Sequence, residues 1–226
     1  MPALHRHKLV WLSPQGWRQA LAFAPGHAEA LQSWRRENWP LVARRRDADA
    51  TAGEVALGLP LPPCPVNGKV RIALRLPASA VTRSSEALAL SAVLPSLPSR
   101  WQADAAALAA QAAAQHLTLR VYGSAAWQAL TGLNYIGLRS DIDLLFYPES
   151  VAALEAGVAL FQHHAHQLPL DGEIIFPSGS AVAFKEWLMA LEAGADMRVM
   201  AKENDGVSLR RIDMLTATLA QTAGRR

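Results

Sequence analysis

The chain has 226 residues, of which 51% are hydrophobic and 18% charged, so it is long enough for one large or two small domains with a substantial core. No apolar run approaches the roughly 20 residues of a membrane-spanning helix, and the N-terminal segment lacks the apolar region of a secretory signal. A single cysteine, Cys64, excludes an internal disulfide and offers no zinc site. We therefore expect a cytoplasmic protein.

The charge balance is mildly basic, with a formal net charge of +3 and an isoelectric point near 9.3. Such a bias is compatible with an anionic substrate, an acidic protein partner or nucleic acid. Charge alone does not decide among these partners.

The first 95 residues predict a small α+β domain with a modest antiparallel sheet. An amphipathic helix is expected over 27–39, where Pro40 closes it, and a turn over 13–17. Alternating apolar runs between proline, glycine and asparagine turns predict strands over 7–12, 41–45, 54–59 and 69–76. Residues 77–100 contain three prolines around an apolar stretch and predict a connector with a short helix.

From residue 96 the pattern predicts a second domain with a mixed sheet and flanking helices. Residues 102–117 are rich in alanine, which has the highest intrinsic helix propensity, so a helix is expected there. Further helices are expected over 149–167, 185–194 and 212–221. Strands are expected over 119–122, 140–147, 173–176, 181–184, 198–202 and 207–211.

The segment 119–147 carries the chemistry. A short apolar strand ends in Gly123 and Ser124, and after a helical turn and a loop the next strand opens with Asp141 and Asp143. Side chains alternate along a strand, so both carboxylates point to one face, where they repel unless a cation neutralises them. Magnesium is the usual cation for carboxylates and substrate phosphates, and a Gly-Ser turn before a helix suits a phosphate.

An apolar strand, Gly-Ser and then Asp-x-Asp at the start of the next strand resembles the nucleotidyltransferase superfamily, which has a polymerase-β-like fold. The spacing between Ser124 and Asp141 is longer than the generic motif usually has. A narrower family accommodates it, because YGSAAWQALTGLNYIGLRSDIDLLF resembles the phosphoribosyl-dephospho-CoA transferases, the holo-acyl-carrier-protein synthases of malonate decarboxylase. The similarity extends to RHKLVWL, WPLVARRR, VALGLPLP, LDGEIIFPSGSAVAFKEW and VMAKENDGVSL, and so covers most of the chain.

This resemblance implies a two-part α+β enzyme. Residues 1–95 would bind substrate or carrier protein, and 96–226 would form a nucleotidyltransferase catalytic domain. The family transfers a phosphoribosyl-dephospho-CoA group from 2′-(5″-triphosphoribosyl)-3′-dephospho-CoA to a serine of the acyl-carrier subunit of malonate decarboxylase, releasing pyrophosphate. The implied cofactor is Mg2+, and the implied partners are that carrier subunit and the CoA precursor. No membrane is implied, and nucleic acid is disfavoured as a partner. Carrier proteins are usually acidic, which agrees with the basic bias of the chain.

The expected catalytic and metal-binding residues are three carboxylates. Asp141 and Asp143 would bridge the metal ions, and a third acid would hold the ion nearest the attacking hydroxyl. In the superfamily this acid lies on a later strand, and here Asp171 and Glu173 share one face of an extended segment. We prefer Asp171 to Glu173 as the third acid, and both assignments remain open. An ordinary turn at Asp171 and Gly172 is the competing interpretation.

The expected phosphate-binding residues are Gly123, Ser124, Lys185, Lys202 and Arg44. Arg44 begins a run of three arginines, and guanidinium groups suit phosphate. If this run lies on a strand, Arg44 and Arg46 share one face and Arg45 points to the other. A run of arginines exposed to solvent, without a ligand, is an equally good interpretation.

Two other functions remain open from the sequence. A different nucleotidyltransferase would act on RNA or another protein with an ordinary nucleoside triphosphate, and a non-catalytic module would bind nucleotides without turnover. His163, His164 and His166 have no zinc-type spacing, so we expect surface histidines at the end of a helix.

Overall fold

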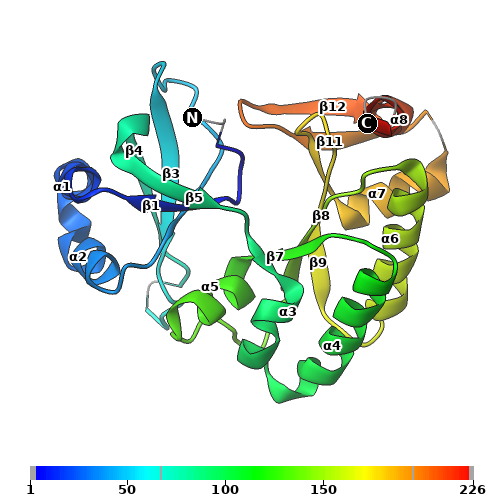
Figure 1. Cartoon of the computed structure of the whole chain (residues 1–226), viewed down its shortest axis with the longest axis horizontal. Helices are drawn as coiled ribbons and strands as arrows, with labels where there is room; N and C mark the ends of the chain where they lie inside the picture. The colour runs from blue at the N-terminus through cyan, green and yellow to red at the C-terminus, as the bar shows by residue number, and fades with distance from the viewer. Residues whose placement is uncertain (1–3, 67, 195, 224–226) are drawn as a thin grey trace. The chain divides into compact units, whose positions relative to one another are not determined.

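The computed structural model describes residues 4–66, 68–194 and 196–223, which divide into two compact units (Figure 1). The first contains the residues up to Ala87 together with Leu133–Tyr135 and Asn204–Gly206, and the second contains the remainder. The sequence placed the boundary at residue 95. The stretch from Leu88 belongs to the second unit because Leu90 and Val93 are buried in that unit's core.

The first unit is a five-stranded antiparallel sheet with two main helices. Its strand order is β4-β3-β2-β1-β5, and its helices bury Trp17, Ala20, Leu31 and Trp34. The strands are β1 (Leu9–Leu12), β2 (Leu41–Ala43), β3 (Glu54–Pro60), β4 (Arg71–Pro77) and β5 (Val81–Ser85). The helices are α1 (Pro14–Phe23) and α2 (Ala28–Arg36), with 3-10 turns η1 (Pro25–His27) and η2 (Ala78–Ala80). The four predicted strands and the predicted helix α2 are confirmed.

Three details of the first unit differ from the sequence prediction. The segment 13–17 begins a helix instead of a turn, because Ser13 Oγ accepts a hydrogen bond from Gly16 N at 2.9 Å and Pro14 occupies the first turn. Strand β2 ends at Ala43, so the arginine run lies in a loop without strand alternation. Strand β5, which pairs with β1, had no counterpart in the prediction.

The second unit is built on a seven-stranded mixed sheet of order β12-β11-β10-β9-β8-β7-β6, in which β8 and β9 are parallel and the other pairs antiparallel. Its strands are β6 (Leu88–Ala89), β7 (Leu119–Tyr122), β8 (Ile142–Phe146), β9 (Leu170–Ile175), β10 (Ala181–Ala183), β11 (Arg198–Lys202) and β12 (Val207–Arg211). Its helices are α3 (Leu90–Val93), η3 (Leu94–Ser96), α4 (Ser99–Ala114), α5 (Gly123–Thr131), α6 (Val151–His164), α7 (Phe184–Ala193) and α8 (Ile212–Ala223). The predicted α+β class is confirmed.

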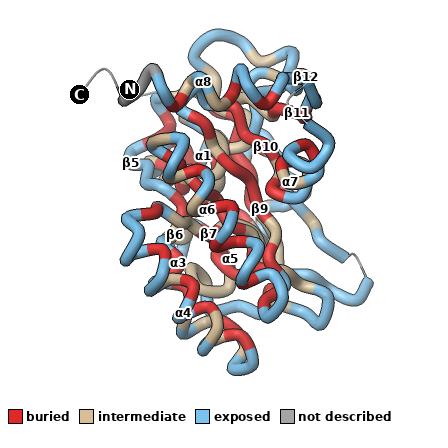
Figure 2. The backbone as a smooth tube through the Cα atoms, turned by 90° about the vertical axis from the view of Figure 1, so that its right-hand side faces the viewer, coloured by how far each residue is buried: buried red, intermediate tan, exposed pale blue. Residues whose placement is uncertain are grey.

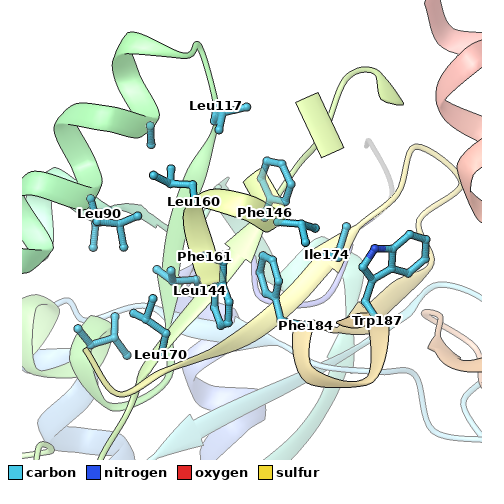
Figure 3. Packing of buried hydrophobic residues seen from close by; sticks show 14 of the residues in the cluster. Leu90, Leu117, Leu144, Phe146, Leu160, Phe161, Leu170, Ile174, Phe184 and Trp187 are labelled. Carbon is cyan, nitrogen blue, oxygen red and sulfur yellow. The ribbon is translucent and has the colours of Figure 1, made fainter. Parts of the chain in front are cut away.

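One face of this sheet packs against the helices. The even-numbered residues of β8, Ile142, Leu144 and Phe146, are buried together with side chains of α4, α6, α7 and α8. Figure 3 shows Leu144 and Phe146 of β8 among side chains of α6 and α7. The Phe184 ring stacks on Phe161 at 4.0 Å and lies 6.1 Å from Phe146. Figure 2 shows β9 and β10 largely in the buried class. Because side chains alternate along a strand, the odd-numbered residues of β8 and β9 face the other side of the sheet.

His164 does not lie on the surface as the sequence predicted. It is 4% exposed, and its Nε2 lies 3.2 Å from Gln111 Oε1 on α4. Burial lowers the pKa of His164, since the charged form loses solvation. The residue is therefore part of the packing between α4 and α6.

Within the described residues, no helix combines the length and apolar character needed to cross a bilayer.

Candidate active site

Asp143 and Asp171 lie side by side on the sheet face that points away from the helices. They are register partners on the adjacent parallel strands β8 and β9, and such strands are about 4.8 Å apart. Asp141 is the residue immediately before β8, two positions from Asp143. Two of the predicted carboxylates, Asp143 and Asp171, therefore lie on one face at the start of two neighbouring strands, and Asp141 lies just before the first of these strands.

Gly123 lies against the carboxylate of Asp143. Its φ is +67°, in the left-handed region that favours glycine, and a Cβ built there would lie 2.7 Å from Asp143 Cγ and closer still to Oδ2. Tyr122, just before it, is the register partner of Asp143 on β7. The Gly-Ser turn and the Asp-x-Asp strand, far apart in the sequence pattern, thus form one site.

Helix α5 begins at this point. Tyr122 at its N-cap position supplies no side-chain cap, and the first backbone N–H groups of a helix have no intrahelical acceptor. These amides and the half-buried Ser124 hydroxyl can donate to an anion. The structure brings Gly123 to the Asp143 carboxylate, as the phosphate-binding prediction requires, and Ser124 follows it in the first turn of α5.

The two candidates for the third acid have different surroundings. Asp171 is 36% exposed at its side chain, accepts a hydrogen bond from Gly172 N at 2.8 Å and lies 3.4 Å from Lys185 Nζ. Glu173 is 4% exposed at its side chain and accepts a hydrogen bond from Lys202 Nζ at 2.8 Å. Glu173 is the register partner of Leu145 and lies two residues farther along β9 than Asp171. Accessibility and register both favour Asp171.

Gly172 separates these two acids and brings β9 close to β8. Its φ is +154°, and a Cβ there would lie 2.8 Å from the Leu144 carbonyl carbon. Asp171 and Gly172 lie inside β9, which begins at Leu170, so the alternative of a turn before the strand is wrong. Strand β9 begins earlier than the segment predicted from residue 173.

The three predicted cationic residues differ in how they are held. Lys185 lies in the first turn of α7, is 66% exposed and already contacts Asp171. Lys202 forms an ion pair with Glu173, the more deeply buried of the two acids on β9. Arg44 belongs to the first unit, where its Nη2 donates to Asp47 Oδ2 at 2.6 Å and its Nε to the Leu57 carbonyl at 3.1 Å. This hydrogen bond lowers the pKa of Asp47, and phosphate binding by Arg44 stays a prediction.

The donor set suits Mg2+. Across residues 4–66, 68–194 and 196–223, no three His, Cys, Asp or Glu side chains are close enough to bind a metal ion in the arrangement observed. Magnesium does not need such a cage, because it binds through one or two carboxylates and completes its shell with waters and substrate phosphates. Asp143 and Asp171 on one face, with Asp141 just before β8, would offer hard oxygen ligands beside a backbone that can hold phosphate.

Sequence reasoning missed Gln128, which organises the loop before Asp141. Its Nε2 donates to the Ser96 carbonyl at 2.7 Å, and its Oε1 accepts from Ile136 N at 3.0 Å. Ser140 Oγ then accepts from Gly137 N at 2.9 Å. A glutamine inside an apolar helix gave no signal of this role, because its partners lie far along the chain.

Comparison with known proteins identifies the family. The model described as the phosphoribosyl-dephospho-CoA transferase MdcG N-terminal domain matches residues 5–87, and the corresponding C-terminal domain model matches residues 87–213. The chain belongs to the phosphoribosyl-dephospho-CoA transferase family. The two family domains meet at residue 87, where the N-terminal stretch of the first compact unit also ends.

Curated relatives of this family carry the same name, phosphoribosyl-dephospho-CoA transferase. The protein of Xanthomonas campestris pv. campestris (strain 8004) is 43% identical over 206 residues, which cover 90% of this chain and 92% of the relative. The protein of Bradyrhizobium diazoefficiens is 38% identical over 186 residues, which cover 80% of each. No solved structure matches the chain significantly. The resemblance noted in the sequence is confirmed, and the chain is a transferase enzyme.

Proposed function

We propose that this enzyme transfers the 2′-(5″-phosphoribosyl)-3′-dephospho-CoA group from 2′-(5″-triphosphoribosyl)-3′-dephospho-CoA to a serine of the malonate decarboxylase acyl-carrier subunit. The name shared by its relatives supports the transferred group. The observation that carries the reaction type is the contact of the Gly123 backbone with Asp143, whose register partner is Asp171. The cytoplasmic location expected from the sequence is part of the same proposal.

The reaction breaks a phosphoanhydride bond of the triphosphate and forms a phosphodiester bond to the serine. The serine oxygen forms a bond to the α-phosphorus, the bond between that phosphorus and the α–β bridging oxygen breaks, and pyrophosphate leaves with the bridging oxygen. The serine hydroxyl proton passes to a base. Asp171 suits that role, because its side chain is accessible and stands beside Asp143.

Asp141, Asp143 and Asp171 would hold Mg2+, which when bound neutralises charge on the reacting phosphate oxygens. The chain's own groups position the substrate. The amides at the start of α5 and the Ser124 hydroxyl would donate to the phosphates of the leaving group. Lys185 is exposed enough to turn from Asp171 towards an incoming phosphate, whereas Lys202 is held by Glu173. The first unit would bind the CoA moiety or the carrier.

The test is intact-mass spectrometry of the carrier subunit after incubation with this protein, Mg2+ and the precursor. We expect a mass gain equal to the prosthetic group, together with one pyrophosphate per carrier. A carrier whose acceptor serine is alanine should gain no mass. Asp141→Ala should lower the rate at least about 100-fold, a typical loss when one group that stabilises transition-state charge is removed.

Other outcomes would redirect the assignment. Incorporation from ATP, CTP or UTP into RNA or a protein, with none from the precursor, would indicate an ordinary nucleotidyltransferase. Tight precursor binding by calorimetry without any transfer to the carrier would refute the proposed acceptor. Full activity of Asp141→Ala would refute the role of the carboxylates.

A further inference from the structure

The hairpin formed by β11 and β12 exposes an apolar row at one edge of the second unit's sheet. We define the hairpin face as Arg198, Met200, Lys202, Val207, Leu209 and Arg211, which pair across the two strands. Met200 and Leu209 are direct register partners and are 45% and 64% exposed, and Val207 is 47% exposed. The opposite face of β11 carries Val199 and Ala201, which are fully buried.

This exposure is not the usual scatter of apolar residues. Isolated surface leucines are common, but adjacent exposed apolar side chains with a polar rim mark interaction surfaces. Here the three side chains come from neighbouring positions on two paired strands, and β12 is the last strand of the sheet order (Figure 1). An apolar row of this kind indicates a partner that covers it.

The hairpin face continues the face that bears the acids. Lys202 is the register partner of Ala181 on β10, and Ala183 is the register partner of Glu173 on β9. Register partners point to the same side, and Lys202 Nζ indeed reaches Glu173 Oε1 at 2.8 Å. The β10 residues between them are alanines, whose small side chains do not separate the two surfaces. From β9 to β12 is three strand spacings, roughly 14 Å.

The charge of the hairpin face favours an acidic partner. Its six strand positions hold three basic residues and no acidic one. Lys202 pairs with Glu173, and Arg211 pairs with the exposed Asp196 and Asp213. Arg198 has no ion-pair partner among the described residues. Exposed ion pairs contribute only about 0–1 kcal/mol, so a partner's carboxylates can replace those of Arg211 at little cost.

From these observations we infer that the hairpin face docks the protein whose serine receives the transferred group, through an acidic surface that also presents apolar side chains. This inference rests on the proposed function. An acceptor serine must reach the phosphate held beside Asp143, so its protein must rest near the acids on the same side of the sheet. A domain of about 100 residues has a radius of gyration of about 13 Å, which matches the roughly 14 Å from hairpin to acids.

The chain offers a matched control for the test. Leu209 and Met189 are exposed to nearly the same extent, 64% and 63%. Met189 lies on α7, whose Phe184 and Trp187 pack into the core on the opposite side of the sheet. Leu209→Glu and Met189→Glu therefore introduce the same charge at similar exposure on opposite sides. Arg198→Glu tests the charge separately, at a position without a packing role.

The experiment measures KM for the carrier subunit and kcat at saturating precursor, with precursor binding by calorimetry and Tm as controls. We expect Leu209→Glu and Arg198→Glu each to raise the carrier KM at least about tenfold, equivalent to about 1.4 kcal/mol, with kcat within twofold. Met189→Glu should change KM less than twofold. Precursor affinity should not change in any variant.

The alternatives are distinguishable. If wild type transfers the group but neither hairpin variant changes KM more than twofold, docking on this face is refuted and the proposed function stands. If wild type binds precursor but transfers nothing to the carrier, both are refuted. Equal effects of Leu209→Glu and Met189→Glu would mean non-specific repulsion and also refute the docking face. If Leu209→Glu lowers Tm markedly, Arg198→Glu decides the matter.

Discussion

Gly123→Ala is the sharpest test of the site, because it perturbs the contact that brings the Gly-Ser turn and the Asp-x-Asp strand together. The new Cβ would lie 2.7 Å from Asp143 Cγ, so the carboxylate or the start of α5 must move. The backbone φ of +67° adds a strain of about 1–2 kcal/mol for any residue with a Cβ. A displacement of about 1 Å at a reacting centre can reduce a rate about 100-fold.

The matched control is Gly132→Ala, at the C-cap of the same helix. Gly132 has a φ of +72°, and nothing lies within 4 Å of a Cβ built there. Both variants should therefore lose about 1–2 kcal/mol of stability from backbone strain in urea unfolding. Only Gly123→Ala should lose group transfer at least about 100-fold in the intact-mass assay.

Two results would refute this reasoning. Transfer by Gly123→Ala within about threefold of Gly132→Ala would show that the contact with Asp143 does not position the acids. A Gly132→Ala variant as inactive as Gly123→Ala would show that backbone strain in α5, and not the local clash, determines the loss.

Three further changes probe the framework of the second unit. Lys202→Met should lower the free energy of unfolding in urea by about 2 kcal/mol, because the buried Glu173 loses its lysine, and adding Glu173→Gln should recover most of it. The pKa of His164 in the folded protein is below its ordinary 6.5. On acidification the unfolded chain therefore takes up a proton at a higher pH than the folded protein does. Tm should therefore fall as the pH drops through about 6.5, and His164→Gln should flatten that fall. Gly157→Ala should destabilise by about 1–3 kcal/mol despite its better helix propensity, because its Cβ would lie within 2.9 Å of the Phe146 ring.

Each of these has a contradicting outcome. No loss in Lys202→Met would mean that other contacts compensate Glu173. Parallel pH profiles for wild type and His164→Gln would exclude that histidine as the titrating group. A more stable Gly157→Ala would show that α6 can move away from β8, whereas rescue by Phe146→Leu would confirm the clash.

The sequence was most informative where local rules act alone. Alanine propensity identified α4, and alternation between turns identified ten strands that the structure confirms in type. It failed at α1, where the Ser13 cap and Pro14 were read as a turn although they are helix-start signals. It also placed the apolar stretch from Leu88 between the domains, because which core buries Leu90 and Val93 is not a local property.

The candidate site shows the same division. The residue types Gly-Ser and Asp-x-Asp, their order along the chain and the shared face of Asp141 and Asp143 follow from the sequence, because the alternation of side chains along a strand is local. The family was likewise recognisable from these motifs, and the comparisons confirm it.

The tertiary structure decided which of the candidate site residues are neighbours. It made Asp171 the register partner of Asp143, buried Glu173 with Lys202, and engaged Arg44 with Asp47. Strand register, burial and ion pairing all depend on contacts between residues that are distant in the chain. The sequence by itself therefore determined which chemical groups this enzyme has, and the packing of the sheet determined which of them can act together.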